Sequence, residues 1–136
     1  MNPLRVRVME VGESVEIEID AAFKYNRTGV IVTPQQRYRF EAIGSWVDWN
    51  RSCGPEGYAS PNGVLRAAES YRRYPKANWF CLIGCVDKSP TTFFEIGTGI
   101  TYEPMAAGEL MCFANDCAWF YWNNSGQIRL RIMREK

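Results

Sequence analysis

Hydrophobic and polar residues alternate with a period of two in three stretches of the chain, 15–19, 38–43 and 127–132. Because successive side chains of a β-strand point to opposite faces, this pattern predicts three strands with one buried face and one solvated face. Arg129 and Arg131 fall on the polar side of the last stretch, with Arg134 nearby. We interpret these arginines as part of a solvated face and not as a phosphate-binding track.

Other stretches are more continuously apolar and rich in β-branched and aromatic residues, which is typical of central strands in a sandwich. They are 29–33, 79–86, 93–96 and 110–113. Residues 5–9 are a candidate edge strand. Turn signals rich in Pro, Gly and Asn separate the stretches. The sequence therefore predicts seven or eight strands.

Only residues 64–74 show a helical pattern, and an irregular loop is the alternative interpretation of this segment. The chain has no internal repeat and no linker. Closely spaced strands without alternating helices favour an all-β fold. We therefore expect a two-sheet antiparallel β-sandwich or jelly roll that forms a single domain over residues 1–136, with one short helix in 64–74.

Composition and charge exclude several classes of function. The 136 residues include 16 Lys and Arg against 15 Asp and Glu, and the formal net charge of +1 provides no global attraction for nucleic acid. Histidine is absent, which removes the commonest general base. No apolar run approaches the roughly 20 residues of a membrane span, and the N-terminus lacks a signal-peptide pattern. We expect a cytoplasmic protein, with non-classical export left open.

The five cysteines at positions 53, 81, 85, 112 and 117 are an odd number, so a complete disulfide framework is not expected. Cys81 and Cys85 lie in one predicted strand, where four residues span about 13 Å and cannot share a zinc ion. The cysteines are therefore predicted to act mainly as small buried hydrophobic residues.

Two polar clusters flank the aromatic loop between the last two predicted strands. Asn115 and Asp116 follow one strand, and residues 123–126, with the sequence Asn-Asn-Ser-Gly, precede the other. Calcium prefers six to eight oxygen ligands from carboxylates, amides and backbone carbonyls, and this loop offers all three. Asp116, Asn123 and Asn124 are the candidate ligands. The alternative is that Asn-Asn-Ser-Gly simply forms a favourable turn.

Motifs along residues 15–132 carry a resemblance to a known family. They are 28–30, 40–46, 54–57, 81–84, 94–97 and 115–126, and Asp116 precedes Asn123 by seven residues. In this pattern the chain resembles the PA-I galactophilic lectins, a family of calcium-dependent bacterial lectins with a galactose-binding-domain-like β-sandwich.

The resemblance implies a calcium site with side-chain ligands from Asp116, Asn123 and Asn124. Backbone carbonyls of Phe120 and of the region around Asp48 would complete the protein's ligands. Two hydroxyls of a galactose-like saccharide would take the remaining positions, with Asp116 and Asn123 also hydrogen-bonding to them. Binding of single sugars would be weak, and a homo-oligomer would provide avidity.

The chain departs from the family in three places. Residues 58–63 lack the His and Gln that contact the sugar in the galactose-binding lectins, so Ser60 and Asn62 are the candidate replacements and the sugar specificity is open. Residues 64–78 form a longer segment, which could cover the site, reshape it or mediate an oligomer contact. Trp119 or Trp122 in the calcium loop either stacks on a sugar or plugs the loop.

Three functional hypotheses follow. The first is a non-enzymatic, calcium-dependent lectin. The second is an interaction or assembly sandwich that has lost sugar binding. The third is a hydrolase acting through carboxylates such as Glu56, Glu95 or Asp116, but the sequence does not pair these acids.

Overall fold

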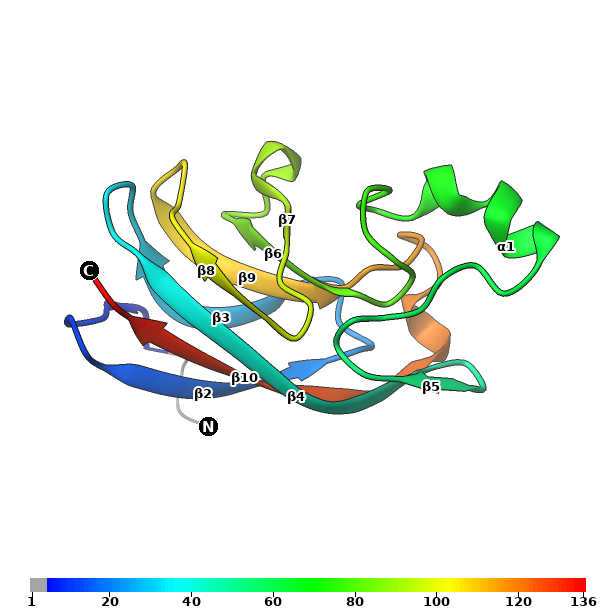
Figure 1. Cartoon of the computed structure of the whole chain (residues 1–136), viewed down its shortest axis with the longest axis horizontal. Helices are drawn as coiled ribbons and strands as arrows, with labels where there is room; N and C mark the ends of the chain where they lie inside the picture. The colour runs from blue at the N-terminus through cyan, green and yellow to red at the C-terminus, as the bar shows by residue number, and fades with distance from the viewer. Residues whose placement is uncertain (1–4) are drawn as a thin grey trace.

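Two β-sheets pack face to face in the computed structural model, which describes residues 5–136 (Figure 1). The strand order is β1-β3-β9-β6-β7 in one sheet, called here the upper sheet, and β2-β10-β4-β5 in the other, the lower sheet, where β8 also pairs with β4. The upper strands are β1 (Arg7–Val8), β3 (Asn26–Val32), β9 (Gly108–Ala114), β6 (Leu82–Val86) and β7 (Phe94–Glu95). The lower strands are β2 (Ser14–Asp20), β10 (Asn124–Arg134), β4 (Tyr38–Asp48), β5 (Arg51–Cys53) and β8 (Gly99–Tyr102).

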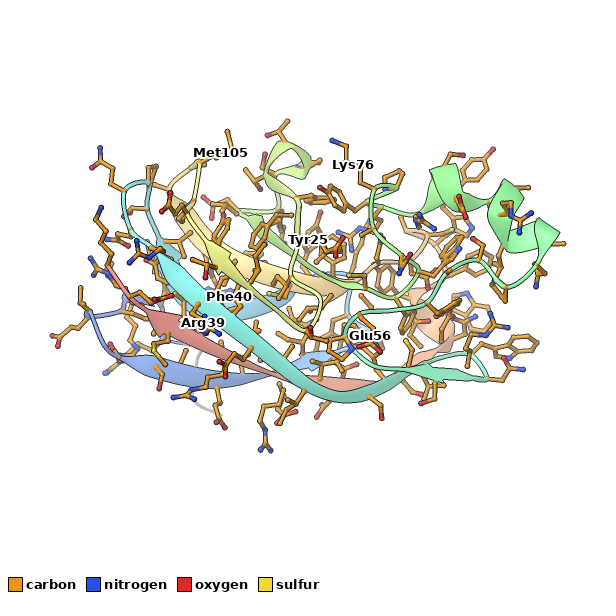
Figure 2. The ribbon with its side chains drawn as sticks, in the orientation of Figure 1. Tyr25, Arg39, Phe40, Glu56, Lys76 and Met105 are labelled. Atoms are coloured by element: carbon orange, nitrogen blue, oxygen red, sulfur yellow. The ribbon has the colours of Figure 1, made fainter. Side chains whose placement is uncertain are left out.

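The lower sheet has one face in the core and one in solvent. Ile128, Leu130 and Ile132 of β10 are fully buried, whereas the intervening arginines are exposed. Phe40 of β4, labelled in Figure 2, belongs to the same core, and the neighbouring Arg39 is exposed. The period-two alternation in the sequence therefore follows directly from the two environments of this sheet.

The upper sheet is covered on both faces in its centre. A second apolar cluster on its outer face includes Cys81, Ile83, Cys85 and Phe113, with Tyr25, Tyr74 and Phe93 packed against it. Burial on both faces explains why β6 and β9 are continuously apolar. All five cysteines are free thiols, and four of them are buried while Cys53 is partly buried.

The fold confirms the expected all-β sandwich. Each predicted strand region contains a strand, including the edge strand β1. The sequence did not predict β5 and β8, so the structure has ten strands in its described part instead of seven or eight. One pairing, between β1 and β3, is parallel and not antiparallel as expected.

The expected short helix is present and begins one residue before the predicted range 64–74. It is α1 (Gly63–Ala67), followed by the 3₁₀ turn η1 (Glu69–Tyr71). The side chain of Asn62 caps α1 by accepting a hydrogen bond from the Leu65 backbone N–H. Two further 3₁₀ turns are η2 (Pro90–Thr92) and η3 (Tyr121–Asn123). None of the helices within residues 5–136 has the length and apolar character needed to cross a membrane.

Candidate cation and ligand site

A cavity of about 380 Å³ lies where the β4–β5 hairpin, the loop 115–123 and helix α1 meet. These segments gather at the end of the sandwich opposite to the C-terminus (Figure 1). Asp48, Asp116, Phe120 and Asn123 line the cavity. Four residues predicted from the sequence as cation ligands are thus brought to one cavity.

The ends of three strands position the acidic side of this cavity. Asp116 follows β9, and Asn124 begins β10, where it pairs with Asp48 at the end of β4. The Asn124 Nδ2 donates to Asp116 Oδ2 at 3.1 Å, and the Cys117 backbone N–H donates to Asp116 Oδ1 at 2.7 Å. Because the register of β10 and β4 pairs Asn124 with Asp48, and Asn124 also binds Asp116, the two aspartates lie close to each other.

The carboxyl group of Asp48 is held by Tyr58, a residue that the sequence analysis did not predict in the site. The Tyr58 hydroxyl donates to Asp48 Oδ2 at 2.5 Å. The Arg51 guanidinium lies over the Tyr58 ring, 4.9 Å from its centroid. Burial raises the pKa of Asp48 above its ordinary value, and the Tyr58 hydrogen bond and Arg51 only partly oppose this effect.

The two carboxyl groups lack a protein cation at salt-bridge distance. Asp116 is only 3% exposed, and among residues 5–136 neither it nor Asp48 forms a salt bridge to Lys or Arg. Burial, followed by repulsion from Asp48, raises the pKa of Asp116 to about 6. The acidic side of the cavity therefore favours a proton or another cation.

Two amide oxygens beside these carboxyl groups are unpartnered. The Oδ1 atoms of Asn123 and Asn124 are both buried and accept no hydrogen bond in the described structure. A buried acceptor without a donor costs about 1–3 kcal/mol, so such atoms need an explanation. A hard cation would satisfy both oxygens and neutralise the neighbouring carboxylates.

The donor set suits calcium better than a transition metal. Carboxylate and amide oxygens are typical calcium ligands, and a backbone carbonyl can join them. The part of the chain that the structure describes contains no group of three or more His, Cys, Asp or Glu able to hold a metal. The side-chain oxygens of Asp116, Asn123 and Asn124 are of the type that the calcium ion implied by the resemblance prefers, and the buried thiol of Cys117 next to Asp116 has a pKa raised to about 11.

Backbone contacts fix the loop that carries Phe120. The 3₁₀ turn η3 follows Phe120, whose carbonyl accepts from the Asn123 N–H at 3.5 Å. The Trp49 N–H donates to the Asn123 carbonyl at 3.1 Å, which ties this loop to the end of β4. The Tyr121 hydroxyl donates to the carbonyl of Ala114 and accepts from Arg73 at 2.9 Å.

Asn115, the partner of Asp116 in the Asn-Asp motif, has a structural role. It is fully buried, and its Oδ1 accepts from the Tyr74 N–H at 2.9 Å. Its Nδ2 donates to the carbonyls of Tyr74, Ala77 and Asn78 at 2.8–3.1 Å. This side chain attaches the segment 74–78 to the end of β9.

Of Ser60, Asn62 and Trp119, which were predicted to contact the sugar, only Asn62 lines the cavity. Ser60 is not among the cavity-lining residues; its hydroxyl donates to Glu69 and accepts from Trp79 Nε1 at 2.9 Å. Asn62 lines the cavity, but its Oδ1 caps α1. Trp119 is exposed outside the lining and packs edge-on against Tyr71, with ring centroids 6.0 Å apart.

Apolar side chains form the other side of the cavity. Trp79, expected as a core residue, is buried but also lines the cavity. Val64, Leu65 and Ala68 from the region of α1 also line the cavity, as does Trp49 next to Asp48. These apolar lining residues were not predicted, because a short helix pattern does not indicate what its apolar face contacts.

Comparisons with known proteins support the fold. No protein-family profile matches the chain, and no curated protein sequence matches it. A solved structure described as "EclA N-terminal domain; PllA-like lectin" superposes with a TM-score of 0.68 at 18% identity, covering 88% of this chain and 95% of that chain. The chain therefore shares its fold with a lectin domain, and the resemblance predicted from the sequence is confirmed at the level of fold.

Proposed function

We propose that this protein is a calcium-dependent carbohydrate-binding protein. The observation that carries the proposal is that two buried, unpartnered amide oxygens lie beside two carboxyl groups that form no salt bridge within residues 5–136, at a cavity. The fold it shares with a PllA-like lectin supports a saccharide as the ligand.

Asp116, Asn123 and Asn124 would hold the calcium ion through side-chain oxygens, with the Phe120 carbonyl and the Asp48 region as further donors. When bound, calcium would supply coordination positions for two hydroxyl groups of a saccharide. Asp116 and Asn123 line the cavity, where their remaining hydrogen-bonding capacity would orient those hydroxyls. Asn62 keeps its amide NH₂ as a donor because its Oδ1 caps the helix.

The arrangement supports binding without catalysis. Glycosidases need two carboxyl groups placed on either side of the scissile bond. Glu56 and Glu95, which the hydrolase hypothesis names as examples together with Asp116, lie outside the cavity lining, and Glu95 is in β7 at an edge of the upper sheet. The Asp48 carboxyl already accepts from Tyr58. We therefore propose that the protein is a lectin and not an enzyme, and that a homo-oligomer raises the avidity of individually weak sites.

A thermal melt of chelator-treated protein with and without millimolar calcium tests the proposal. At a calcium concentration 100 times the dissociation constant, ligand linkage contributes about 2.7 kcal/mol, which raises Tm by about 9 °C for a chain of this length. Asp116→Ala should abolish the rise, whereas Glu41→Gln, which removes one negative charge from the exposed outer face of β4, should retain it. The absence of a rise in the wild type would refute the calcium site.

An interaction or assembly module that has lost sugar binding is the second candidate. The exposed rings of Trp49, Trp119 and Trp122 on segments at this end of the molecule favour it, because clusters of exposed aromatic residues are common in protein interfaces. A glycan array probed in calcium and in chelator separates the two candidates. Calcium-dependent glycan binding supports the lectin, whereas a calcium-stabilised protein that binds no glycan supports the assembly module.

A further inference from the structure

The cavity that contains the candidate cation site is also lined by one arginine. Arg51 lines it, and Asp48 and Asp116 are the other charged residues of the lining. Without a metal ion, the two carboxyl groups outweigh the single guanidinium. A calcium ion would reverse this balance, because its two positive charges offset both carboxylates and leave the charge of Arg51 uncompensated. The calcium-loaded cavity would therefore attract a ligand that carries one negative charge.

The guanidinium of Arg51 does not serve as a counter-ion within the protein. It lies over the Tyr58 ring, and no carboxylate of residues 5–136 is within salt-bridge distance of it. Asp48 is the register partner of Arg51 in the pairing of β4 with β5, yet its carboxyl group accepts a hydrogen bond from the Tyr58 hydroxyl instead. An arginine that served mainly to neutralise Asp48 would normally form a direct ion pair with it.

Stacking on Tyr58 leaves the hydrogen-bond donors of Arg51 available. An aromatic ring covers a face of the guanidinium, whereas the five N–H groups point outward in the plane of the group. Arg51 is partly exposed and lines the cavity, so a ligand can reach these donors. A carboxylate matches their fixed geometry, because its two oxygens can accept two parallel hydrogen bonds from one guanidinium.

The hairpin that carries Arg51 is tied to the loop of the candidate cation ligands. Trp49 and Asn50 form the two-residue turn between β4 and β5, and Trp49 has a φ of +56°, which is costly for a bulky residue. The Trp49 N–H donates to the Asn123 carbonyl at 3.1 Å, which helps to hold this turn. Arg51 therefore has a defined position relative to Asn123, as a ligand that contacts both residues would require.

We propose that Arg51 makes the protein selective for acidic saccharides, with a carboxylate such as that of a hexuronic acid bound to the guanidinium while two sugar hydroxyls bind at the cation site. This inference rests on the proposed lectin function and adds the class of sugar. The cavity volume of about 380 Å³ lies within the range of roughly 300–1,000 Å³ that is usual for small organic ligands, so one sugar ring can be accommodated between the two groups.

Calorimetric titration of the calcium-loaded protein at pH 7.5 tests the inference with three probes. They are methyl β-galactoside, methyl β-galacturonide and the methyl ester of that galacturonide, and the same three compounds of the α-mannose series extend the test to a second sugar. The acid and its ester share the ring and the hydroxyls but differ in charge. Because charge-assisted hydrogen bonds are about twice as strong as neutral ones, we expect the acid to bind about tenfold more tightly than the ester.

Arg51→Gln should remove this preference, so that acid and ester bind with similar affinity. Arg51→Lys should retain only part of it, since an ammonium group keeps the charge but lacks the planar fork of donors. Arg66→Gln is the matched control and should retain the full preference, because it removes the same charge from an exposed position of α1 outside the cavity lining. Far-UV circular dichroism and the calcium-induced rise in Tm show whether each variant keeps its fold and its cation site.

The outcomes separate this inference from the proposed function. Equal affinities for acid and ester, with calcium-dependent binding of either neutral glycoside intact, would overturn the inference and leave the lectin function standing. A preference for the acid that persists in Arg51→Gln would also overturn it, because the carboxylate would then bind the calcium ion or another group. An equal loss of the preference in Arg66→Gln would do the same, since it would indicate general attraction by positive charge.

If Arg51→Gln does not fold, Arg51→Lys decides the question, and an undiminished preference in that variant overturns the inference. If no compound of either series binds in the presence of calcium, the proposed function fails and the inference fails with it.

Discussion

Asn123 provides a direct test at the scale of single residues, because its Oδ1 accepts no hydrogen bond from residues 5–136. Its Oδ1 is buried without a partner beside two carboxyl groups. Asn123→Asp keeps an oxygen in place and adds negative charge. We expect a lower Tm in chelator, since three carboxylates then repel one another, and a larger calcium-induced rise than in the wild type.

Differential scanning fluorimetry in chelator and in calcium measures both effects. Gln127→Glu is the control, because it makes the same change of charge at an exposed position of β10. If residues 123–126 were only a favourable turn, Asn123→Asp would behave like this control and calcium would not restore its stability.

The cysteines give a second prediction at this scale. Burial is the main cause that raises the pKa of Cys53, Cys85 and Cys117 to about 11 and that of Cys81 to about 12, and it also raises the pKa of Cys112. At pH 8 a thiol of pKa 11 is about 0.1% thiolate, and the thiolate is the reactive form.

Ellman's reagent should therefore react with less than one thiol per native chain at pH 8 and with all five in denaturant. Because the folded-state pKa values are raised, the neutral thiols favour the native state, and this stability is lost as the pH rises above the unfolded-state value near 8.5. Rapid native reaction of several thiols would contradict the burial on which this prediction rests.

At the scale of elements, a glycine in the loop after β5 controls how the site is assembled. Gly57 has a φ of +71°, and an added Cβ would lie 2.1 Å from the Trp79 carbonyl oxygen and 2.5 Å from the Cys81 nitrogen. Both obstacles are backbone atoms, so they cannot rotate away. We expect Gly57→Ala to reduce the free energy of unfolding by about 3 kcal/mol or more and to displace Tyr58 from Asp48.

Urea denaturation measures the loss, with Gly63→Ala as the control. Gly63 begins α1, and an added Cβ there meets no atom within 4 Å. Alanine is the better helix former by about 1 kcal/mol, so Gly63→Ala should be neutral or slightly stabilising. Equal behaviour of the two variants would mean that the 57–58 turn does not pack against residues 79–81 as described.

The same elements show what the sequence could predict. The strands with strict alternation or continuous apolar runs were predicted because each residue's environment is set by the sheet face on which it lies. β5 and β8, of three and four residues, were missed because neither lies in a long alternating stretch or a continuous apolar run. Their existence depends on pairing with β4.

The site was predictable to the extent that its residues are close in sequence to strand ends. The site residues converge because β9 and β4 end close to where β10 begins, and the polar clusters at these strand ends were visible in the sequence. They are Asp48, Asp116, Asn123 and Asn124. Contacts that depend on loop packing were not predictable. The hydrogen bonds of Asn115 depend on how the segment 64–78 packs, and the bond of Tyr58 to Asp48 depends on the turn at Gly57.

At the scale of the whole molecule, the position of the cavity allows a test of avidity. The C-terminus lies at the end of the sandwich opposite to α1 and the β4–β5 hairpin (Figure 1). A dimeric coiled coil fused after Lys136 should therefore leave the affinity for a free glycoside unchanged. On a surface coated with the same glycoside, the fusion should bind more tightly, by up to 10²–10⁴-fold if the linker lets both sites engage.

Surface plasmon resonance at high and low glycoside density measures this gain, and Asp116→Ala in both halves of the fusion should abolish it. The gain should fall toward the monovalent affinity at low density, because the second site then finds no ligand within reach of the linker. If the unfused protein already shows the density-dependent gain, it forms the expected homo-oligomer by itself, and light scattering would show more than one chain. If neither form gains affinity at high density, the cavities do not act as separate glycan sites on one face of the assembly, and multivalent recognition would be wrong as the basis of function.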